Sequence, residues 1–458
     1  MDTEKLHETI DRRREEFVDT LATLVAQPSI SARDEGVAEC AELLAQEMKD
    51  IGINSEILPT AGQPVVYGEL KAEDPDAFTL LCYGHYDVQP PEPLELWESP
   101  PFEPDVRDGR MYGRGTGDNK GQLLAHVMAA SAWLETAGAP PINLKFVFEG
   151  EEESGSPNLG DFVADNRDRL AADLVLISDG TMHPSGAPLI SLGNRGVIGV
   201  TLKARGADRD NHSGNKGGVA PNPAWMLIHV LANTVDPSGR VLVEGFYDDV
   251  RPVTETDREI IARLPFDPVE FGATMGLPTV DMPKEEYYRK IMLEPYFNIS
   301  GLLSGYTGPG SKTIIPAEAE VRIDIRTVVD QDFDDLVGKL RAHVAAIDPR
   351  VEVLVRGIGG MAPSRTPADH PSIPVIAGSV ERARGREPFV NLSSGGSLPN
   401  AVWPRVLGVP HVGIPYANAD ENNHSPNENL DLGCFHMGIR TSAEVFAGLA
   451  EARAEGRI

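Results

Sequence analysis

Three apolar segments of this chain each lead to charged residues, and this repeated pattern strongly limits what the chain can fold into. Residues 79–82 lead to His85. Residues 143–148 lead to three adjacent glutamates, and residues 173–178 end beside Asp179. Short continuous apolar runs predict strands that are buried on both faces. Since functional groups gather at the carboxyl ends of strands in open α/β sheets, we expect these charged residues to meet at one sheet edge.

Length and composition restrict the class of protein. A chain of 458 residues is too long for one ordinary core, which predicts two domains. Its net charge of −29 argues against nucleic acid as a partner, because phosphate binding requires basic residues. The N-terminal residues lack the apolar core of a signal peptide, and no segment approaches the ~18 apolar residues of a membrane span. We therefore expect a cytoplasmic protein without membrane contacts.

Two common kinds of site are excluded by the sequence. The three cysteines, Cys40, Cys82 and Cys434, are far apart and form no CxxC motif, which argues against a disulfide scaffold or a cysteine-bound zinc. The glycine-rich stretch around Asp118 is not a phosphate loop, because its lysine is followed by Gly121 instead of Ser or Thr. It is not a dinucleotide fingerprint either, since Asp118 occupies the third glycine position.

The middle of the chain changes character after Gly193. Apolar periodicity there predicts the order β-α-β-β-α-β, the pattern of a split-βαβ, ferredoxin-like unit. The predicted elements cover residues 197–204, 223–234, 296–302, 317–326, 332–347 and 351–355. The predicted fold is therefore α/β, with a mixed sheet flanked by helices and an inserted α+β domain. We expect residues 1–194 and 367–458 to form the larger domain and residues 195–366 the inserted one, and we assign no structure to the acidic residues 242–288.

The charged residues at the predicted sheet edge favour a metal site. His85 and Asp87 stand two apart, so on an extended backbone they project to the same side. A metal-binding histidine usually has such a carboxylate partner. Several uncompensated carboxylates at a buried edge would be costly, and divalent metal ions would explain them together. A hydrogen-bonded polar pair, a helix-capping Asp118 and a solvated glutamate face are the alternatives for the separate motifs.

Six motifs together resemble the zinc exopeptidase family that contains carnosinase-like cytosolic dipeptidases, carboxypeptidases and deacylases. They are GHYDVQP, GRGTGDNKG, FVFEGEEESGS, LISDG, DNHSG and NNHSPNENL. The resemblance implies two divalent metal ions, most simply zinc, although manganese or cobalt suit the same ligands. It implies Asp118 as the ligand shared by both metals, Glu152 as the general base and Asp87 as the partner of His85. The implied ligands are His85, Asp118, Glu153, Asp179 and His424, and a slip of one place between Glu151 and Glu152 stays open.

The resemblance also implies residues that contact the substrate. His212 resembles a histidine that reaches the partner subunit's site, which implies a homodimer with the inserted domain as dimerisation and lid domain. Arg326 resembles a carboxylate-binding arginine, a task that suits the two-pronged guanidinium. Without the family, a surface salt bridge to Asp324 or Asp330 would explain it. The remaining candidates for substrate binding are Gly395, Gly396, Ser397, Asn298 and Thr313.

The predicted function is metal-dependent hydrolysis of the amide bond of dipeptides or other short peptides, with Glu152 as the general base. An N-acyl amino acid deacylase or a carboxypeptidase of the same family is the alternative. In the family, an Asp at the position of Asp179 accompanies substrates with a free amino end, which favours the peptidase. A noncatalytic binding protein should lack Glu152, and a glycosidase would leave both His85 and His424 without a role.

Overall fold

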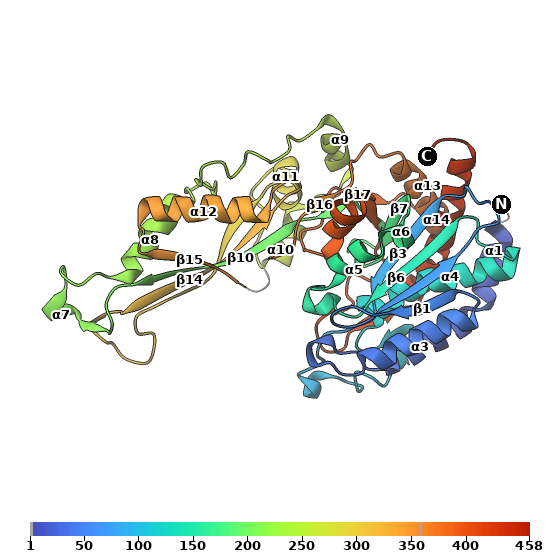
Figure 1. The fold of residues 1–458 in the computed structure, drawn as a ribbon, viewed down its shortest axis with the longest axis horizontal. Coiled ribbons are helices and arrows are strands. Elements are labelled where there is room, and N and C mark those ends of the chain that lie inside the picture. The colour runs from blue at the N-terminus through green and yellow to red at the C-terminus, as the bar shows by residue number, and fades with distance from the viewer. Residues whose placement is uncertain (1–2, 357–359) are drawn as a thin grey trace.

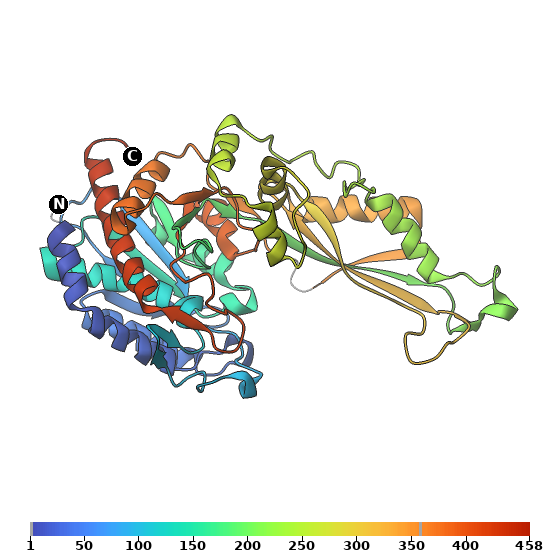
Figure 2. The ribbon, with the colours of Figure 1, turned by 180° about the vertical axis from the view of Figure 1, so that it is seen from behind.

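The computed structural model describes residues 3–356 and 360–458 and has two parts. A larger domain contains both chain termini, and a narrower domain projects from it (Figures 1 and 2). The predicted fold, a mixed α/β sheet flanked by helices with an inserted α+β domain, is confirmed. None of the helices in the described residues is long and apolar enough to cross a membrane.

The larger domain is built on an eight-stranded mixed sheet with the order β1-β2-β6-β3-β7-β18-β8-β17. Its strands are β1 Asn54–Leu58, β2 Val65–Leu70, β3 Thr79–His85, β6 Asn143–Glu149, β7 Leu174–Ile177, β8 Leu189–Ser191, β17 Phe389–Asn391 and β18 His411–Gly413. The central strands β6, β3, β7 and β18 run parallel to one another. Their carboxyl ends therefore lie at one edge of the sheet.

Strand β3 is buried on both faces, as its continuous apolar sequence predicts. Leu80 and Cys82 belong to the same core cluster as the residues of helix α4. Leu81 and Tyr83 project to the opposite face and join a second cluster around Trp403. This alternation follows from the two-residue period of a strand.

Helices cover both faces of the large sheet. The larger core cluster includes residues of α1 Thr3–Arg12, α2 Arg14–Ala26, α3 Val37–Asp50, α4 Gly121–Ala137, α13 Ser372–Arg384 and α14 Leu432–Ala454. The opposite face packs against α5 Leu159–Asp165, α6 Arg167–Leu170 and the turn Trp403–Leu407. Helices α1 and α2 are separated only by Arg13, whose guanidinium donates to Ser131 of α4.

The projecting domain has a four-stranded antiparallel sheet with the order β12-β14-β10-β15. Its strands are β10 Gly196–Arg205, β12 Tyr296–Ser304, β14 Glu318–Thr327 and β15 Val351–Val355. Helices α8 Pro223–Thr234 and α12 Phe333–Ile347 each pack one apolar side against one face of this sheet. The chain order is the predicted β-α-β-β-α-β order.

The acidic middle segment, which the sequence leaves unassigned, forms three helices: α9 Glu255–Arg263, α10 Pro268–Thr274 and α11 Lys284–Met292. Ile261, Leu264 and Tyr288 from this segment, and Met292 at the end of α11, belong to the core cluster of the larger domain. Part of the inserted sequence therefore packs back on the large sheet.

Short strand pairs complete the structure. β9 Gly193–Asn194 and β16 Ser364–Arg365 pair where the chain enters and leaves the projecting domain. β4 Asp105–Arg107, β5 Arg110–Tyr112 and β19 Asn429–Asp431 form a small sheet. β11 Asn211–His212 pairs with β13 Ile314–Ile315 and leads to α7 Ser213–Lys216, at the far tip of the projecting domain (Figure 1).

Candidate metal centre and substrate cleft

The parallel strands bring the predicted charged residues together. His85 is the last residue of β3, the glutamate run follows β6, and Asp179 follows β7. His424 comes from the loop after β18, and Asp118 from the turn that precedes α4. The sheet edge predicted from the sequence therefore exists, with all five of these elements opening on it.

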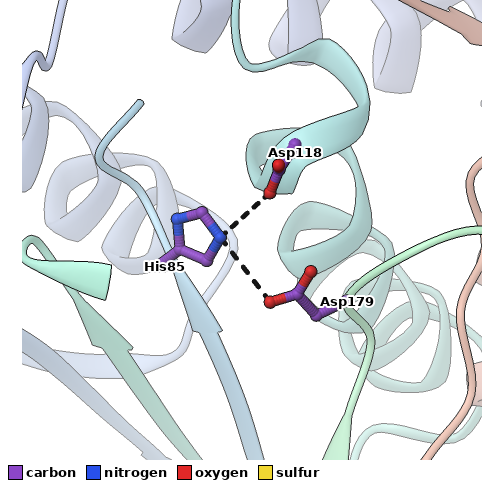
Figure 3. Close-up of side chains that lie close together, drawn as sticks. All are labelled: His85, Asp118 and Asp179. Carbon is purple, nitrogen blue, oxygen red and sulfur yellow. Dashed lines mark hydrogen bonds and ion pairs between the residues drawn. The ribbon is translucent and has the colours of Figure 1, made fainter. Parts of the chain in front are cut away.

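Two groups of metal-ligand atoms share one aspartate. His85, Asp118 and Asp179 form the first group, and Asp118, Glu153 and His424 form the second. In the first, His85 Nε2 lies 3.2 Å from Asp118 Oδ1 and 3.7 Å from Asp179 Oδ2 (Figure 3). In the second, His424 Nε2 lies 3.0 Å from Asp118 Oδ2 and 3.2 Å from Glu153 Oε2. The two oxygens of Asp118 thus face different groups.

These distances fit a pair of divalent metal ions. Ligand atoms at about 2.0–2.1 Å from a tetrahedral zinc lie about 3.3 Å from one another, close to the separations within both groups. The donors are imidazole nitrogens and carboxylate oxygens, a set that suits zinc, manganese and cobalt. A single carboxylate with one oxygen in each group is suited to join two metal ions. The residues present therefore match the predicted two-metal centre in number, spacing and chemistry.

Asp87 positions both the histidine and the glutamate run. Its Oδ1 lies 3.4 Å from His85 Nδ1, so the other ring nitrogen of this histidine is left to face the metal groups. The same carboxylate accepts hydrogen bonds from the backbone N–H groups of Glu152, at 3.2 Å, and Glu153, at 3.1 Å. Asp87 thereby fixes the turn that carries two of the predicted site residues.

Glu428 holds the Asp118 loop, and the sequence analysis missed it. This fully buried carboxylate accepts backbone hydrogen bonds from Gly115, Gly117 and Asp118. Its other oxygen accepts from the buried Arg114 at 2.6 Å. The acidic residue in the motif NNHSPNENL was visible in the sequence. Its partners lie about three hundred residues earlier in the chain, however, and nothing local reveals them.

Two further residues that the sequence analysis missed connect the elements of the site. Asn119, which follows Asp118 across a cis peptide bond, donates to the carbonyl of Ser178 at the end of β7. Gln89 donates to Glu153 Oε2 at 2.9 Å. Both residues stand close to predicted ligands in the motifs GHYDVQP and GRGTGDNKG, so proximity in sequence was the only available indication.

The electrostatics of the centre are those of crowded acids. Burial raises the pKa of Asp179 to about 7, and the nearby Asp118 charge adds to this effect. Burial also raises the pKa of Glu152 well above its usual value. Although burial opposes it, hydrogen bonds to His424 and His85 lower the pKa of Asp118. Hydrogen bonds to Asp118 and Glu153 raise the pKa of His424 to about 10. The acids outnumber the two histidines, and bound cations would compensate the excess charge.

The three glutamates after β6 have different surroundings. Glu152 lines the cleft together with Asp118 and Asp179. Glu153 belongs to the second ligand group. Glu151 accepts a hydrogen bond from Asn158 at the start of α5. The geometry thus separates Glu152 and Glu153 from Glu151 in the way that the family resemblance implies, while their roles remain predictions.

The metal groups open into a cleft of about 460 Å³. Gly396 and Ser397 are among the residues that line it, whereas Gly395 is not. Arg326 of β14 donates to Ser397 Oγ at 2.9 Å, so the projecting domain contacts this loop. The salt bridges that offered an alternative explanation do not form between these described residues: Asp324 accepts from Asn298, and Asp330 pairs with Arg251.

Three predicted residues lie away from this cleft. His212 and Thr313 are close to each other at the tip of the projecting domain, where the Ser213 N–H donates to the Thr313 carbonyl. Figure 1 shows that α7, which begins directly after His212, lies far from the larger domain. Asn298 is exposed on β12 and contacts Asp324. Within one subunit, the structure does not bring these side chains to the metal groups.

Known proteins resemble this chain along nearly its whole length. A 30% identical relative, the Cys-Gly metallodipeptidase dug1 of Schizosaccharomyces pombe, aligns over 96% of this chain and 97% of its own length. The human Beta-Ala-His dipeptidase is 29% identical over 98% of this chain and 93% of its own. Among solved structures, the M20 family metallo-carboxypeptidase Sso-CP2 of Sulfolobus solfataricus is 34% identical and superposes with a TM-score of 0.86. It covers 95% of this chain and 99% of its own.

The family model for peptidase family M20/M25/M40 matches residues 81–448. That range includes both ligand groups, the glutamate run and the projecting domain. The predicted resemblance to a family of dipeptidases and carboxypeptidases is confirmed, and so is the prediction of a metallo-exopeptidase. This chain belongs to peptidase family M20/M25/M40.

Proposed function

We propose that this protein hydrolyses the amide bond of dipeptides or other short peptides that end in a free carboxylate. One observation carries the proposal. Asp118 is shared by two ligand groups, and it lines one cleft together with Glu152 and Ser397, the residue to which Arg326 donates. Metal-dependent chemistry and carboxylate binding within one cleft suit a short peptide.

The side chains divide the chemistry among them. His85, Asp118 and Asp179 would hold one metal ion, and Asp118, Glu153 and His424 the other. When bound, such a pair lowers the pKa of a water molecule and polarises the scissile carbonyl. Glu152 would accept the proton of the attacking water and return it to the leaving nitrogen. Glu152 lines the same cleft as Asp118, the aspartate that both ligand groups share, so its carboxylate is placed for this exchange.

The size of the cleft, about 460 Å³, favours small substrates. A guanidinium binds a carboxylate through two parallel hydrogen bonds, and the Gly395–Gly396 backbone N–H groups can add to it. An N-acyl amino acid also ends in a carboxylate, so a deacylase shares this chemistry, and so does a carboxypeptidase. The relatives named as dipeptidases favour the dipeptidase.

We also propose a homodimer in which His212 reaches the partner's cleft. β12 is an edge strand of the projecting sheet, and Ile299, Leu302 and Leu303 on it are exposed. On the adjoining helix layer, Trp225 of α8 is exposed as well. An unpaired edge with apolar side chains is a typical interaction surface. His212 could then donate to the substrate oxygen that becomes negative in the reaction.

The domain boundaries and the cellular location belong to the same proposal. The pairing of β9 with β16 supports boundaries near residues 194 and 366, where the chain crosses between the two sheets. The three cysteines are free, as is usual for cytoplasmic proteins.

A substrate panel tests the proposal. The purified protein is treated with chelator, reloaded with zinc, manganese or cobalt, and assayed on dipeptides, their C-terminal amides, tripeptides and N-acetyl amino acids. We expect metal-dependent hydrolysis of dipeptides, with amides and N-acetyl amino acids cleaved more slowly. Preferential cleavage of N-acetyl amino acids would establish the deacylase instead, and activity that persists without any metal would refute the mechanism.

A further inference from the structure

Arg195 is a buried cation at the junction between the two domains. It is the single residue between β9 and β10, and only 7% of it is exposed. Its two terminal nitrogens each lie 3.4 Å from a backbone carbonyl, those of Lys290 and Gly395. Its guanidinium carbon lies 5.1 Å from the ring centroid of Tyr296, and its Nε has no hydrogen-bond partner. No carboxylate among the residues that the structure describes pairs with it.

An unpaired buried charge calls for an explanation in this chain. Taking a guanidinium out of water is costly unless an opposite charge or good hydrogen bonds compensate it. Two long hydrogen bonds and an aromatic ring offer little compensation. The chain contains 70 acidic residues against 41 basic ones, so an acidic partner would have been easy to supply. An anion that arrives with a ligand would complete the site.

The surroundings of Arg195 indicate which anion that is. The backbone N–H of Arg195 donates to the carbonyl of Ser394, and its guanidinium contacts the backbone carbonyl of Gly395. The next residues of this loop, Gly396 and Ser397, line the cleft. Tyr296, under the Arg195 guanidinium, is the cross-strand neighbour of Arg326 in the projecting sheet. Arg195 and Arg326 therefore approach the same loop, one from the junction and one from the projecting domain.

We propose that Arg195 is a positioning residue for the carboxylate end of the substrate. It holds the Ser394–Ser397 loop through Gly395 and supplies a second positive charge, which the bound carboxylate neutralises. The inference rests on the proposed function, since it adds a residue to the carboxylate end of the same cleft. Arg326 makes the contact on the cleft side, whereas Arg195 acts through the loop and through its charge.

This role makes a specific kinetic prediction. Removing the charge should weaken binding of a free carboxylate and leave a neutral C-terminal amide unaffected. For Arg195→Met we expect KM for the best dipeptide of the panel to rise about tenfold, with a smaller change in kcat. The ratio of kcat/KM between this dipeptide and its C-terminal amide should fall by a similar factor. Arg195→Lys retains the charge and should keep this ratio within about threefold of the wild type.

The controls separate charge from folding. Arg205→Met removes an exposed arginine at the end of β10, the strand that follows Arg195, and we expect it to leave the ratio unchanged. Metal content and the melting temperature are measured for each variant. If Arg195→Met does not fold, Arg195→Gln takes its place as the neutral variant. Should neither neutral variant fold with metal bound, Arg195 is a structural residue and the inference is refuted.

The outcomes distinguish the inference from the proposed function. If the wild type prefers the free carboxylate and Arg326→Met loses this preference, but Arg195→Met keeps it, only the role of Arg195 is refuted. An equal loss of activity on the dipeptide and its amide would also refute it, because a general structural defect acts on both. If the wild type hydrolyses no peptide with any of the three metals, the proposed function fails, and this inference fails with it.

Discussion

Single residues of the centre act through neighbours that are distant in sequence. Asp118 has one oxygen in each ligand group, and its backbone N–H is bonded to Glu428. Glu428 in turn is paired with Arg114 inside the protein. A ligand that must contact two metal ions needs its loop held from behind, because small displacements of either oxygen disturb both groups. The centre therefore depends on residues that touch no metal.

Glu152→Gln should abolish proton transfer and leave the metal groups intact. We expect kcat to fall at least ~100-fold, since general acid–base catalysis contributes about 10²–10⁴. Metal content by elemental analysis should match that of the wild type. Glu151→Gln is the matched control, because Glu151 is bonded to Asn158, and its activity should stay near the wild-type level. An inactive Glu151→Gln beside an active Glu152→Gln would shift the assignment by one residue.

Glu428→Gln should weaken metal binding without removing a ligand. The amide can accept fewer of the loop N–H bonds and no longer neutralises Arg114. Loss of such a supporting residue usually costs about 10–100-fold in metal affinity or activity, so we expect a loss in that range. Zinc titration of the chelator-treated protein measures it. Glu381→Gln, an exposed change on α13, is the control and should bind zinc like the wild type. An unchanged zinc affinity in Glu428→Gln would show that Glu428 does not support the metal centre.

At the scale of elements, helices α4 and α14 pack together, and the metal loop, the turn that contains Asp118, leads directly into α4. His126 of α4 is fully buried, and its Nδ1 lies 3.0 Å from Ser442 Oγ of α14. Ser442 also lies 2.8 Å from the hydroxyl of Tyr416. The metal loop leads directly into α4, so the packing of this helix pair sets the position of Asp118 relative to the sheet.

The buried His126 should make the protein acid-sensitive. Burial lowers its pKa to about 3, whereas an unfolded histidine titrates near 6.5. Between these pH values only the unfolded chain binds the proton, so the free energy of unfolding falls as pH falls from about 6.5. At pH 5 this histidine should cost about 2 kcal/mol relative to pH 7.

Urea unfolding of the metal-free protein at pH 7 and pH 5 measures this loss. In His126→Leu we expect the decrease to be smaller than in the wild type, because the unfolded chain then has one histidine fewer to protonate. His229→Leu changes an exposed histidine on α8 and should leave the wild-type decrease unaltered. Equal pH sensitivity in all three proteins would show that His126 is not responsible.

At the scale of the whole molecule, the elongated shape separates His212 from the cleft of its own subunit. The projecting sheet ends in an unpaired, partly apolar edge strand, and α7 lies at its far tip (Figure 2). A two-fold dimer that joins two such edges would place identical surfaces against each other. In such a dimer His212 and Thr313 could reach the partner's cleft, whereas they lie far from the cleft of their own subunit.

Mixed dimers test this arrangement. His212→Ala and Glu152→Gln should each be inactive alone. After subunit exchange, a heterodimer carries both defects in one site and none in the other, so activity should return in the mixture. A mixture of Glu152→Gln and Asp118→Asn should stay inactive. Each of these subunits has a defect in its own centre, so the heterodimer contains no intact site. Persistent inactivity of the first mixture, with heterodimers demonstrated, would mean that His212 does not act across the interface.

Much of the fold and of the centre could be predicted from local sequence. The apolar runs determined β3, β6 and β7, and their periodicity determined the β-α-β-β-α-β order of the projecting domain, because each depends on side chains a few residues apart. His85, Asp118, Glu153, Asp179 and His424 follow or precede such elements directly. Their meeting at one edge follows from the parallel pairing of the strands that carry them.

Only the tertiary structure determined how distant parts of the chain support that centre. Glu428 holds the Asp118 loop, Arg195 meets Gly395 across the domain junction, and α9–α11 return to the larger core. The first two join residues about two or three hundred positions apart, and nothing in the local pattern around either residue identifies its partner. Periodicity and burial act within a few residues, whereas these contacts exist only after the two sheets and their helices have packed.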